Sequence, residues 1–584
     1  MNFATRSPRR TTLLALAVAL TIALVAPAAT PVALAGTSYQ RISGEGSSWA
    51  ANAIDAMRVN VSQFGITVDY NPSGSTAGRK NFLNGTVDFA ASDIPFQFEP
   101  EDGSAPENPA PGSYAYIPVT AGGTAFMYNL QINGKRVTNL RLSGENVVKI
   151  FTGVITTWND PAIQADNPGL VMPARAIVPV VRSDGSGSSA QFTQWMIAMF
   201  PSLWDDFCSR SGRAPACGFT SFYPTIAGMI AQSGDLGVAG YVSQGFAEGA
   251  IGYVNYSYAL GSAFPVAKVL NAAGYYTEPT PENVAVSLLQ ARINTDESNP
   301  AVYLTQQLDG VYTDADPRSY QLSSYSYLIV PTKVAGQFNE DKGRTLGAFA
   351  YYAMCQAQQY SASLGYSPMP INLVEASFEQ IRKIPGVEVQ SVSIAECKNP
   401  TFSPDGSNVL AENAARPQEC DRQGGQSQCP NGTGGLSNVP TAVSGPATNG
   451  GGQTPGAGTT PAGGSTPSAG STPGGVTPGA GTTANGTPIA GGDLGTDGAP
   501  VIDPDNLNPG EVCDPDTGVC GVVGAPDDGG VTGGVVGAQS PTVLAQSSGW
   551  TSSIAMMLLV IGLTLGLVLV PAVVWRHLSR TEPA

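Results

Sequence analysis

Apolar residues along most of the chain recur with two alternating periods. From Ala50 to Val61 they return every three or four positions, as on one face of a helix, and from Ile66 to Tyr70 they alternate as in a strand. Helical and extended segments continue to replace one another until about Pro400. This pattern predicts an α/β fold for the region.

The same periods place further elements along the chain. They predict a strand over 87–91 and helices over 79–83, 143–150, 346–353 and 374–381. Ser143 is placed to cap its helix, with Leu142 and Val147 at the spacing of a hydrophobic staple. In open α/β sheets of this kind, ligands bind beyond the carboxyl ends of the strands.

One predicted loop has the chemistry of an anion site. Residues 182–188 read Arg-Ser-Asp-Gly-Ser-Gly-Ser between an apolar run over 177–181 and an amphipathic stretch over 192–199. This order predicts a strand, a tight loop and a helix. The first N–H groups of a helix have no partner within it, and the helix dipole adds partial positive charge there. With Arg182 and two hydroxyls beside them, the loop is suited to hold an oxyanion.

Three further segments share this character. Gly-Glu-Gly-Ser-Ser-Trp at 44–49 and Ser-Gly-Ser-Thr-Ala-Gly at 73–78 each open a predicted helix. Asp-Phe-Ala-Ala-Ser-Asp at 88–93 ends a predicted strand with a carboxylate. Each alone is typical of an ordinary turn or cap. Together they supply donors and one acceptor for a common site.

Both ends of the chain differ from this region. Residues 1–35 have the basic start, apolar run and small-residue cleavage site of a secretory signal peptide. Residues 401–549, rich in Gly, Pro, Thr and Ser, predict a disordered linker. Residues 550–576 predict one transmembrane helix, and the positive charge of 577–584 places that tail in the cytoplasm. We therefore expect residues 36–400 at the cell surface, anchored in the plasma membrane.

Charge and cysteine content narrow the class of protein. The net charge of −16 argues against a nucleic-acid partner, because phosphate backbones need clustered Lys and Arg. Eight cysteines in an exported chain predict disulfides rather than a zinc site, since there is no Cys-x-x-Cys and no histidine nearby. Their order suggests local pairs: Cys208 with Cys217, Cys355 with Cys397, Cys420 with Cys429, and Cys513 with Cys520.

Taken in order, the segments resemble the periplasmic phosphate-binding proteins that deliver substrate to phosphate ABC importers. The similarity spans about 40–385 and rests on residues 46–49, 74–78, 85–93, 182–188 and 249–253. It implies a two-lobe α/β fold of the periplasmic-binding-protein kind (type II-like), with a ligand cleft between the lobes. The first lobe would comprise about 38–128 and 325–400, and the second about 129–324.

The resemblance also implies a set of phosphate ligands: Ser48, Trp49, Ser75, Asp93, Arg182, Ser186, Gly187 and Ser188. Asp184 would orient Arg182, and no catalytic residue, metal or cofactor is implied. Trp49 stands where phenylalanine is usual in the family, and Ser188 where threonine is usual. Neither difference removes a donor, because Trp49 keeps its backbone amide and Ser188 keeps a hydroxyl. We expect Arg182→Ala to abolish binding with little change in the melting temperature.

Asp93 is the predicted source of selectivity. Phosphate near neutral pH still carries a proton that a carboxylate accepts, whereas fully ionised sulfate would leave the carboxylate unpaired. An unpaired buried acceptor costs about 1–3 kcal/mol, and more when it is charged. Sulfate should therefore be rejected.

Two other functions remain open. A phosphate-ester hydrolase is disfavoured because the sole histidine, His577, lies beyond the predicted membrane helix and leaves no His base outside the cell. A surface adhesion or wall-spanning protein that reuses the fold would suit the anchor, the linker and an acidic insertion at 99–111. The candidate ligands favour reversible capture of inorganic phosphate, and the resemblance implies the permease of a phosphate ABC importer as partner.

Overall fold

The computed structural model describes residues 39–213, 217–425, 427–442, 511–513 and 520–522. The predicted signal peptide, transmembrane helix and cytoplasmic tail, and most of the predicted linker, lie outside the described residues. Within those residues, no helix has the length and apolar character needed to span a bilayer. The chain divides into two units, 1–455 and 456–584. In the second unit the structure describes one antiparallel pair, β16 (Glu511–Cys513) and β17 (Cys520–Val522).

The first unit is organised around a mixed eight-stranded sheet with the order β2-β1-β3-β15-β4-β10-β8-β9. Its strands are β1 (Ile42–Gly46), β2 (Val68–Asn71), β3 (Phe89–Ser92), β4 (Tyr114–Tyr128), β8 (Val178–Arg182), β9 (Ile230–Gln232), β10 (Ala250–Asn255) and β15 (Ser323–Pro331). β1 runs parallel to β2 and β3, and β8 runs parallel to β9 and β10. β15 and β4 are antiparallel to their neighbours.

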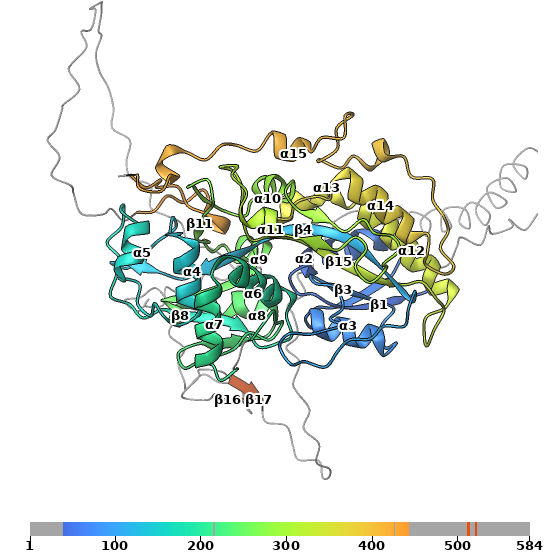
Figure 1. Ribbon diagram of the computed structural model, residues 1–584, viewed down its shortest axis with the longest axis horizontal. Coiled ribbons are helices and arrows are strands. Elements are labelled where there is room, and N and C mark those ends of the chain that lie inside the picture. Colours follow the sequence, from blue (N-terminus) through green and yellow to red (C-terminus); the bar gives the residue numbers. More distant parts are fainter. Residues whose placement is uncertain (1–38, 214–216, 426, 443–510, 514–519, 523–584) are drawn as a thin grey trace, which may run out of the picture. The chain divides into compact units, whose positions relative to one another are not determined.

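Strand β4 joins two lobes. All 15 of its residues are buried, and residues 114–123 pair with β15 whereas 124–128 pair with β10. We call the part around β1, β2, β3 and β15 the first lobe, and the part around β8, β9 and β10 the second lobe. Figure 1 shows α3 and β1 on one side and α4 and α5 on the other, with β4 running between them. The predicted two-lobe α/β fold is confirmed.

Helices flank both parts of the sheet. The first lobe carries α2 (Ala51–Val61), α3 (Ser75–Leu83), α12 (Glu340–Met354), α13 (Gln358–Ser361) and α14 (Ile371–Ile381). The second carries α4 (Gly144–Phe151), α5 (Pro161–Asp166), α6 (Gly187–Met199), α7 (Pro201–Arg210), α8 (Gly234–Val242) and α9 (Tyr256–Gly261). The chain returns to β15 through α10 (Pro281–Leu288) and α11 (Asp309–Tyr312).

A short three-stranded sheet and two strand pairs complete the second lobe and the return path. They are β7 (Arg141–Leu142), β11 (Lys268–Leu270) and β12 (Tyr276–Thr277) in one sheet, β5 (Gln131–Ile132) with β6 (Lys135–Arg136), and β13 (Arg292–Ile293) with β14 (Gln306–Gln307).

Local sequence accounts for several of these elements. The side chain of Ser143 accepts a hydrogen bond from the Asn146 N–H and caps α4, as predicted. In α2, Ile54, Met57 and Val61 are buried, as the helical spacing of apolar residues predicts. Helix α3 begins at Ser75, four residues before the predicted start, because its first turn is small and polar and has no apolar period.

Three of the predicted disulfides are confirmed: Cys208–Cys217, Cys355–Cys397 and Cys420–Cys429. The backbone register of β16 and β17 places Cys513 opposite Cys520. A bond between these two stays a prediction.

Residues 401–425 and 427–442, predicted as the start of the linker, pack on the folded region instead. The Thr401 hydroxyl donates to the Met369 carbonyl in the first lobe at 2.9 Å. Further on, Lys268 of the second lobe donates to Asp421 at 2.7 Å, and the Thr433 side chain is fully buried. Figure 1 shows this segment with α15 (Val409–Glu412) passing from the side of α14 to the side of β11. We call the described residues 401–425 and 427–442 the C-terminal strap, and the folded part extends at least to Thr441 rather than ending at Pro400.

Candidate functional site

Four helices begin where the two lobes meet. The loop after β1 leads into α2, the loop after β8 leads into α6, and α3 and α8 start beside them. The Thr76 N–H at the start of α3 donates to the Gly185 carbonyl of the second lobe at 3.0 Å. The Gln191 side chain of α6 donates to the Asp93 carbonyl of the first lobe at 2.8 Å. The four segments singled out in the sequence, 44–49, 73–78, 88–93 and 182–188, therefore come together.

Asp93 lies at the centre of the first-lobe side. Its side chain accepts the Ser47 hydroxyl at 2.6 Å and the Ser75 hydroxyl at 3.2 Å. A Cβ atom on Gly187 would lie 2.5 Å from both the Asp93 Oδ2 and the Ser75 Oγ. Only glycine at 187 allows the start of α6 to approach this closely. The Asp93 carboxylate consequently lies against a helix N-terminus of the opposite lobe.

Burial controls the protonation of Asp93. Only 2% of the residue is exposed, and burial raises the pKa of its carboxyl from 3.8 to about 6. The Asp235 charge raises it further, while the Ser47 hydroxyl and the Arg182 charge act in the opposite direction. Asp93 is therefore ionised near neutral pH and becomes protonated in mildly acidic solution.

Arg182 is held from two sides. Its Nε and Nη2 donate to Asp184 at 2.8 and 2.5 Å, and its Nη1 donates to Asp235 at 2.5 Å. Its backbone N–H donates to the Tyr253 hydroxyl at 3.2 Å. Burial lowers the pKa of Arg182, but the Asp235 and Asp184 carboxylates raise it more, so the guanidinium stays charged. Burial raises the pKa of Asp184, and the hydrogen bond and charge of Arg182 lower it more.

Several backbone N–H groups at these helix starts have no partner. Among the described residues, no hydrogen bond is made by the N–H groups of Ser48, Trp49, Ser75, Gly187 and Ser188. All five residues are buried. Buried N–H groups without partners are rare in folded proteins. Their gathering beside Arg182 gives the site a set of donors suited to acceptor oxygens.

The side chains of three predicted ligands are already engaged. The Ser48 hydroxyl donates to Asp235 at 2.6 Å, and the Ser186 hydroxyl accepts the Ser189 N–H at 3.2 Å as the cap of α6. The Trp49 indole donates to the Thr124 hydroxyl at 3.2 Å. Ser48 and Trp49 therefore offer their amides rather than their side chains.

Asp235 is a site residue that the sequence prediction missed. It is fully buried near the start of α8, and its partners Ser48 and Arg182 are far from it in the chain. Ser-Gly-Asp at 233–235 repeats the Gly and Ser character of the other helix starts. That similarity is the signal that could have identified it.

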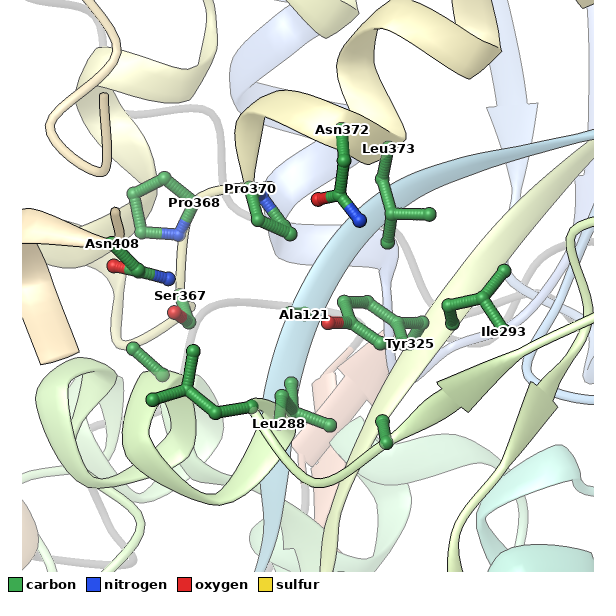
Figure 2. Close-up of a pocket in the computed structure, with 13 residues that line it drawn as sticks. Ala121, Leu288, Ile293, Tyr325, Ser367, Pro368, Pro370, Asn372, Leu373 and Asn408 are labelled. Carbon is green, nitrogen blue, oxygen red and sulfur yellow. The ribbon is translucent and has the colours of Figure 1, made fainter. Parts of the chain in front are cut away.

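A separate cavity of about 150 Å³ lies between β4, β15, α10 and α14 (Figure 2). Its wall includes Ala121, Leu288, Tyr325 and Leu373, and none of the residues that line it is charged. None of the predicted site residues lines it. The predicted site residues lie instead at the polar contact between the lobes.

No group of three or more His, Cys, Asp or Glu side chains in the described part of the chain is arranged to hold a metal ion. Unpaired amides from both lobes, one guanidinium and a carboxylate with a raised pKa therefore lie together between the lobes, an arrangement suited to a small, partly protonated oxyanion.

The comparisons with known proteins agree with this class. Residues 31–357 match the family described as PBP superfamily domain. Phosphate-binding protein PstS 2 of Mycobacterium tuberculosis is 30% identical over 316 residues, 52% of this chain and 76% of that protein. Phosphate-binding protein PstS of Xylella fastidiosa is 28% identical over 350 residues, 59% of this chain and 86% of that protein. The chain belongs to the PstS family of phosphate-binding proteins within the PBP superfamily.

A solved structure of a phosphate-binding protein from Stenotrophomonas maltophilia is also similar. It shares 19% identity, with a TM-score of 0.43, and the match covers 63% of this chain and 99% of that one.

Proposed function

We propose that the protein captures inorganic phosphate reversibly between its two lobes. The ligands would be the amides of Ser48, Trp49, Ser75, Gly187 and Ser188, the hydroxyls of Ser186 and Ser188, the Asp93 carboxylate and the Arg182 guanidinium. The observation that carries this proposal is the set of buried, partnerless N–H groups beside Arg182. The relatives named above are phosphate-binding proteins, which supports the same ligand here.

Asp93 would give the site its selectivity. Phosphate at neutral pH has a proton to donate to the carboxylate, and sulfate has none. The penalty of about 1–3 kcal/mol for an unpaired buried acceptor corresponds to about 5- to 150-fold in affinity. Discrimination of at least this size is expected, because the acceptor is charged.

The captured ion would be handed to the permease of a phosphate ABC importer. The predicted signal peptide over 1–35 and transmembrane helix over 550–576 would keep the folded part outside the cell and tether it to the plasma membrane. This arrangement would hold the receptor near its permease.

Ligand-dependent melting tests the capture. A ligand that binds only the folded state stabilises it by about 2.7 kcal/mol at a hundred times its Kd. The melting temperature should rise with added phosphate and stay constant with added sulfate. A melting temperature that does not change with added phosphate would contradict the proposal.

Uptake measurements separate transport from surface adhesion. Cells that lack the gene should take up labelled phosphate more slowly at limiting concentrations, and the wild-type gene should restore the rate. Normal uptake in the deletion strain would show that the protein does not deliver phosphate to an importer. That result would favour the adhesion hypothesis.

A further inference from the structure

Both oxygens of the Asp235 carboxylate accept hydrogen bonds at the contact between the lobes. Its Oδ2 accepts the Ser48 hydroxyl at 2.6 Å and the Arg182 Nη1 at 2.5 Å. Its Oδ1 accepts the Asn255 N–H at 2.7 Å, and its own N–H donates to the Ser48 Oγ at 3.0 Å. The residue is 0% exposed. Both carboxylate oxygens are therefore engaged with charged or polar partners.

These partners belong to different lobes. Ser48 stands at the end of β1 in the first lobe, whereas Arg182, Asn255 and Asp235 belong to the second. A second contact reinforces the first, because the Tyr258 hydroxyl of the second lobe donates to the Ser48 carbonyl at 2.6 Å. The Ser48–Asp235 bonds exist only while the lobes are in contact.

Asp235 also limits how Arg182 is turned. A guanidinium has five N–H donors in a fixed plane. Asp184 accepts two of them and Asp235 accepts a third, and the Nη1 lies 3.5 Å from the Ser188 Oγ. Two carboxylates on different edges fix the guanidinium plane and leave two N–H groups that no carboxylate accepts.

We propose that Asp235 is a positioning residue that couples closure of the two lobes to the orientation of Arg182. When the lobes meet, the Ser48 hydroxyl and the Arg182 guanidinium share one carboxylate oxygen. The closed form is stabilised by a contact that does not involve the ligand, and the arginine is held ready for an oxyanion. This inference rests on the proposed function for the ligand, but the contact itself is independent of it.

Binding kinetics in the full chain test the coupling. A bound ion leaves only after the lobes open, so Asp235→Asn should raise the phosphate dissociation rate constant at least tenfold and change the association rate constant less than threefold. Asp166→Asn is the matched control, because Asp166 is also a buried second-lobe carboxylate, and its partners Ser143, Asn146 and Tyr276 are not residues of the candidate site. It should lower the melting temperature and leave both rate constants unchanged. An unchanged dissociation rate in Asp235→Asn, or an equal rise in both variants, would overturn the inference.

Ser48→Ala breaks the same contact from the other lobe and leaves Asp235 bonded to Arg182 and Asn255. If the two residues act through one contact, the double variant should dissociate no more than about threefold faster than Asp235→Asn alone. A double variant whose acceleration equals the product of the two single effects would contradict the shared contact.

A ligand-free measurement separates this inference from the proposed function. Fluorescent labels at the exposed positions Phe64 of the first lobe and Phe246 of the second report the distance between lobes by energy transfer. Without phosphate, Asp235→Asn should lower the transfer efficiency relative to the wild type, and Asp166→Asn should not. Equal transfer efficiency in the wild type, Asp235→Asn and Asp166→Asn would refute the coupling even if the wild type binds phosphate. Failure of the wild type to bind phosphate would refute only the proposed ligand.

Discussion

Replacement of Asp93 by asparagine tests the burial of this carboxylate through the pH dependence of stability. The pKa of Asp93 is raised from 3.8 to about 6 by burial, so the folded protein holds this proton more tightly than the unfolded chain does. The resulting stabilisation is fully present below pH 3.8 and is lost as the pH rises through about 6. At 1.36 kcal/mol for each pKa unit, the total is about 3 kcal/mol, of which about 2 kcal/mol is lost between about pH 4.5 and 7.5.

Asparagine does not titrate, so the two proteins should respond differently to pH. The free energy of unfolding of the wild type minus that of Asp93→Asn should fall by about 2 kcal/mol over this window. Urea unfolding in phosphate-free buffer, followed by tryptophan fluorescence at both pH values, measures this difference. Asp102→Asn is the control: burial raises the pKa of Asp102, but hydrogen bonds from Thr220 and Ser104 lower it more. The free energy of unfolding of the wild type minus that of Asp102→Asn should change little over the same pH window. A flat result for Asp93→Asn would refute the burial of its carboxylate in the free protein.

Three further predictions follow from the site and the strap. Gly187→Ala should weaken phosphate binding at least tenfold in a titration, because its Cβ would lie 2.5 Å from Asp93 and Ser75, while Gly240→Ala, with no atom near its Cβ, should bind normally. Arg182→Ala should abolish binding and also lower the free energy of unfolding by about 3–5 kcal/mol, because it leaves the buried Asp235 unpaired, and an unchanged melting temperature would contradict this. A chain ending after Pro400 should melt lower than one ending after Thr441, by about 1 °C for each kcal/mol that the strap contributes to a folded part of this length. Equal melting temperatures would show that the strap adds no stability.

The expectation that Arg182→Ala leaves the melting temperature unchanged does not agree with the structure. The sequence shows only Asp184, two residues away, as a local partner that would orient Arg182. In the structure Arg182 is 2% exposed and also bonded to the fully buried Asp235. That contact spans 53 residues of chain, and no local pattern reveals it.

Elements with a regular period could be predicted from the sequence, and elements held by long-range polar contacts could not. The apolar spacing of α2 and the cap at Ser143 depend on neighbours in the chain, so both follow from local pattern. The C-terminal strap has no such period. Side chain-to-backbone hydrogen bonds hold it against both lobes, and the Cys420–Cys429 bond closes a loop within it.

The candidate site could be predicted from the sequence only in part. Gly- and Ser-rich helix starts are visible in the sequence, and their chemistry is that of anion donors. The sequence could not show which donors are already engaged, such as the Ser48 hydroxyl on Asp235. That distinction depends on how the lobes meet, which only the fold determines.

Calorimetric titration of the full chain with phosphate and then with sulfate at neutral pH tests the central claim most directly. We expect saturable binding of one phosphate per chain and no heat of binding with sulfate. No binding of phosphate, or equal affinity for both anions, would contradict a phosphate receptor whose selectivity comes from Asp93.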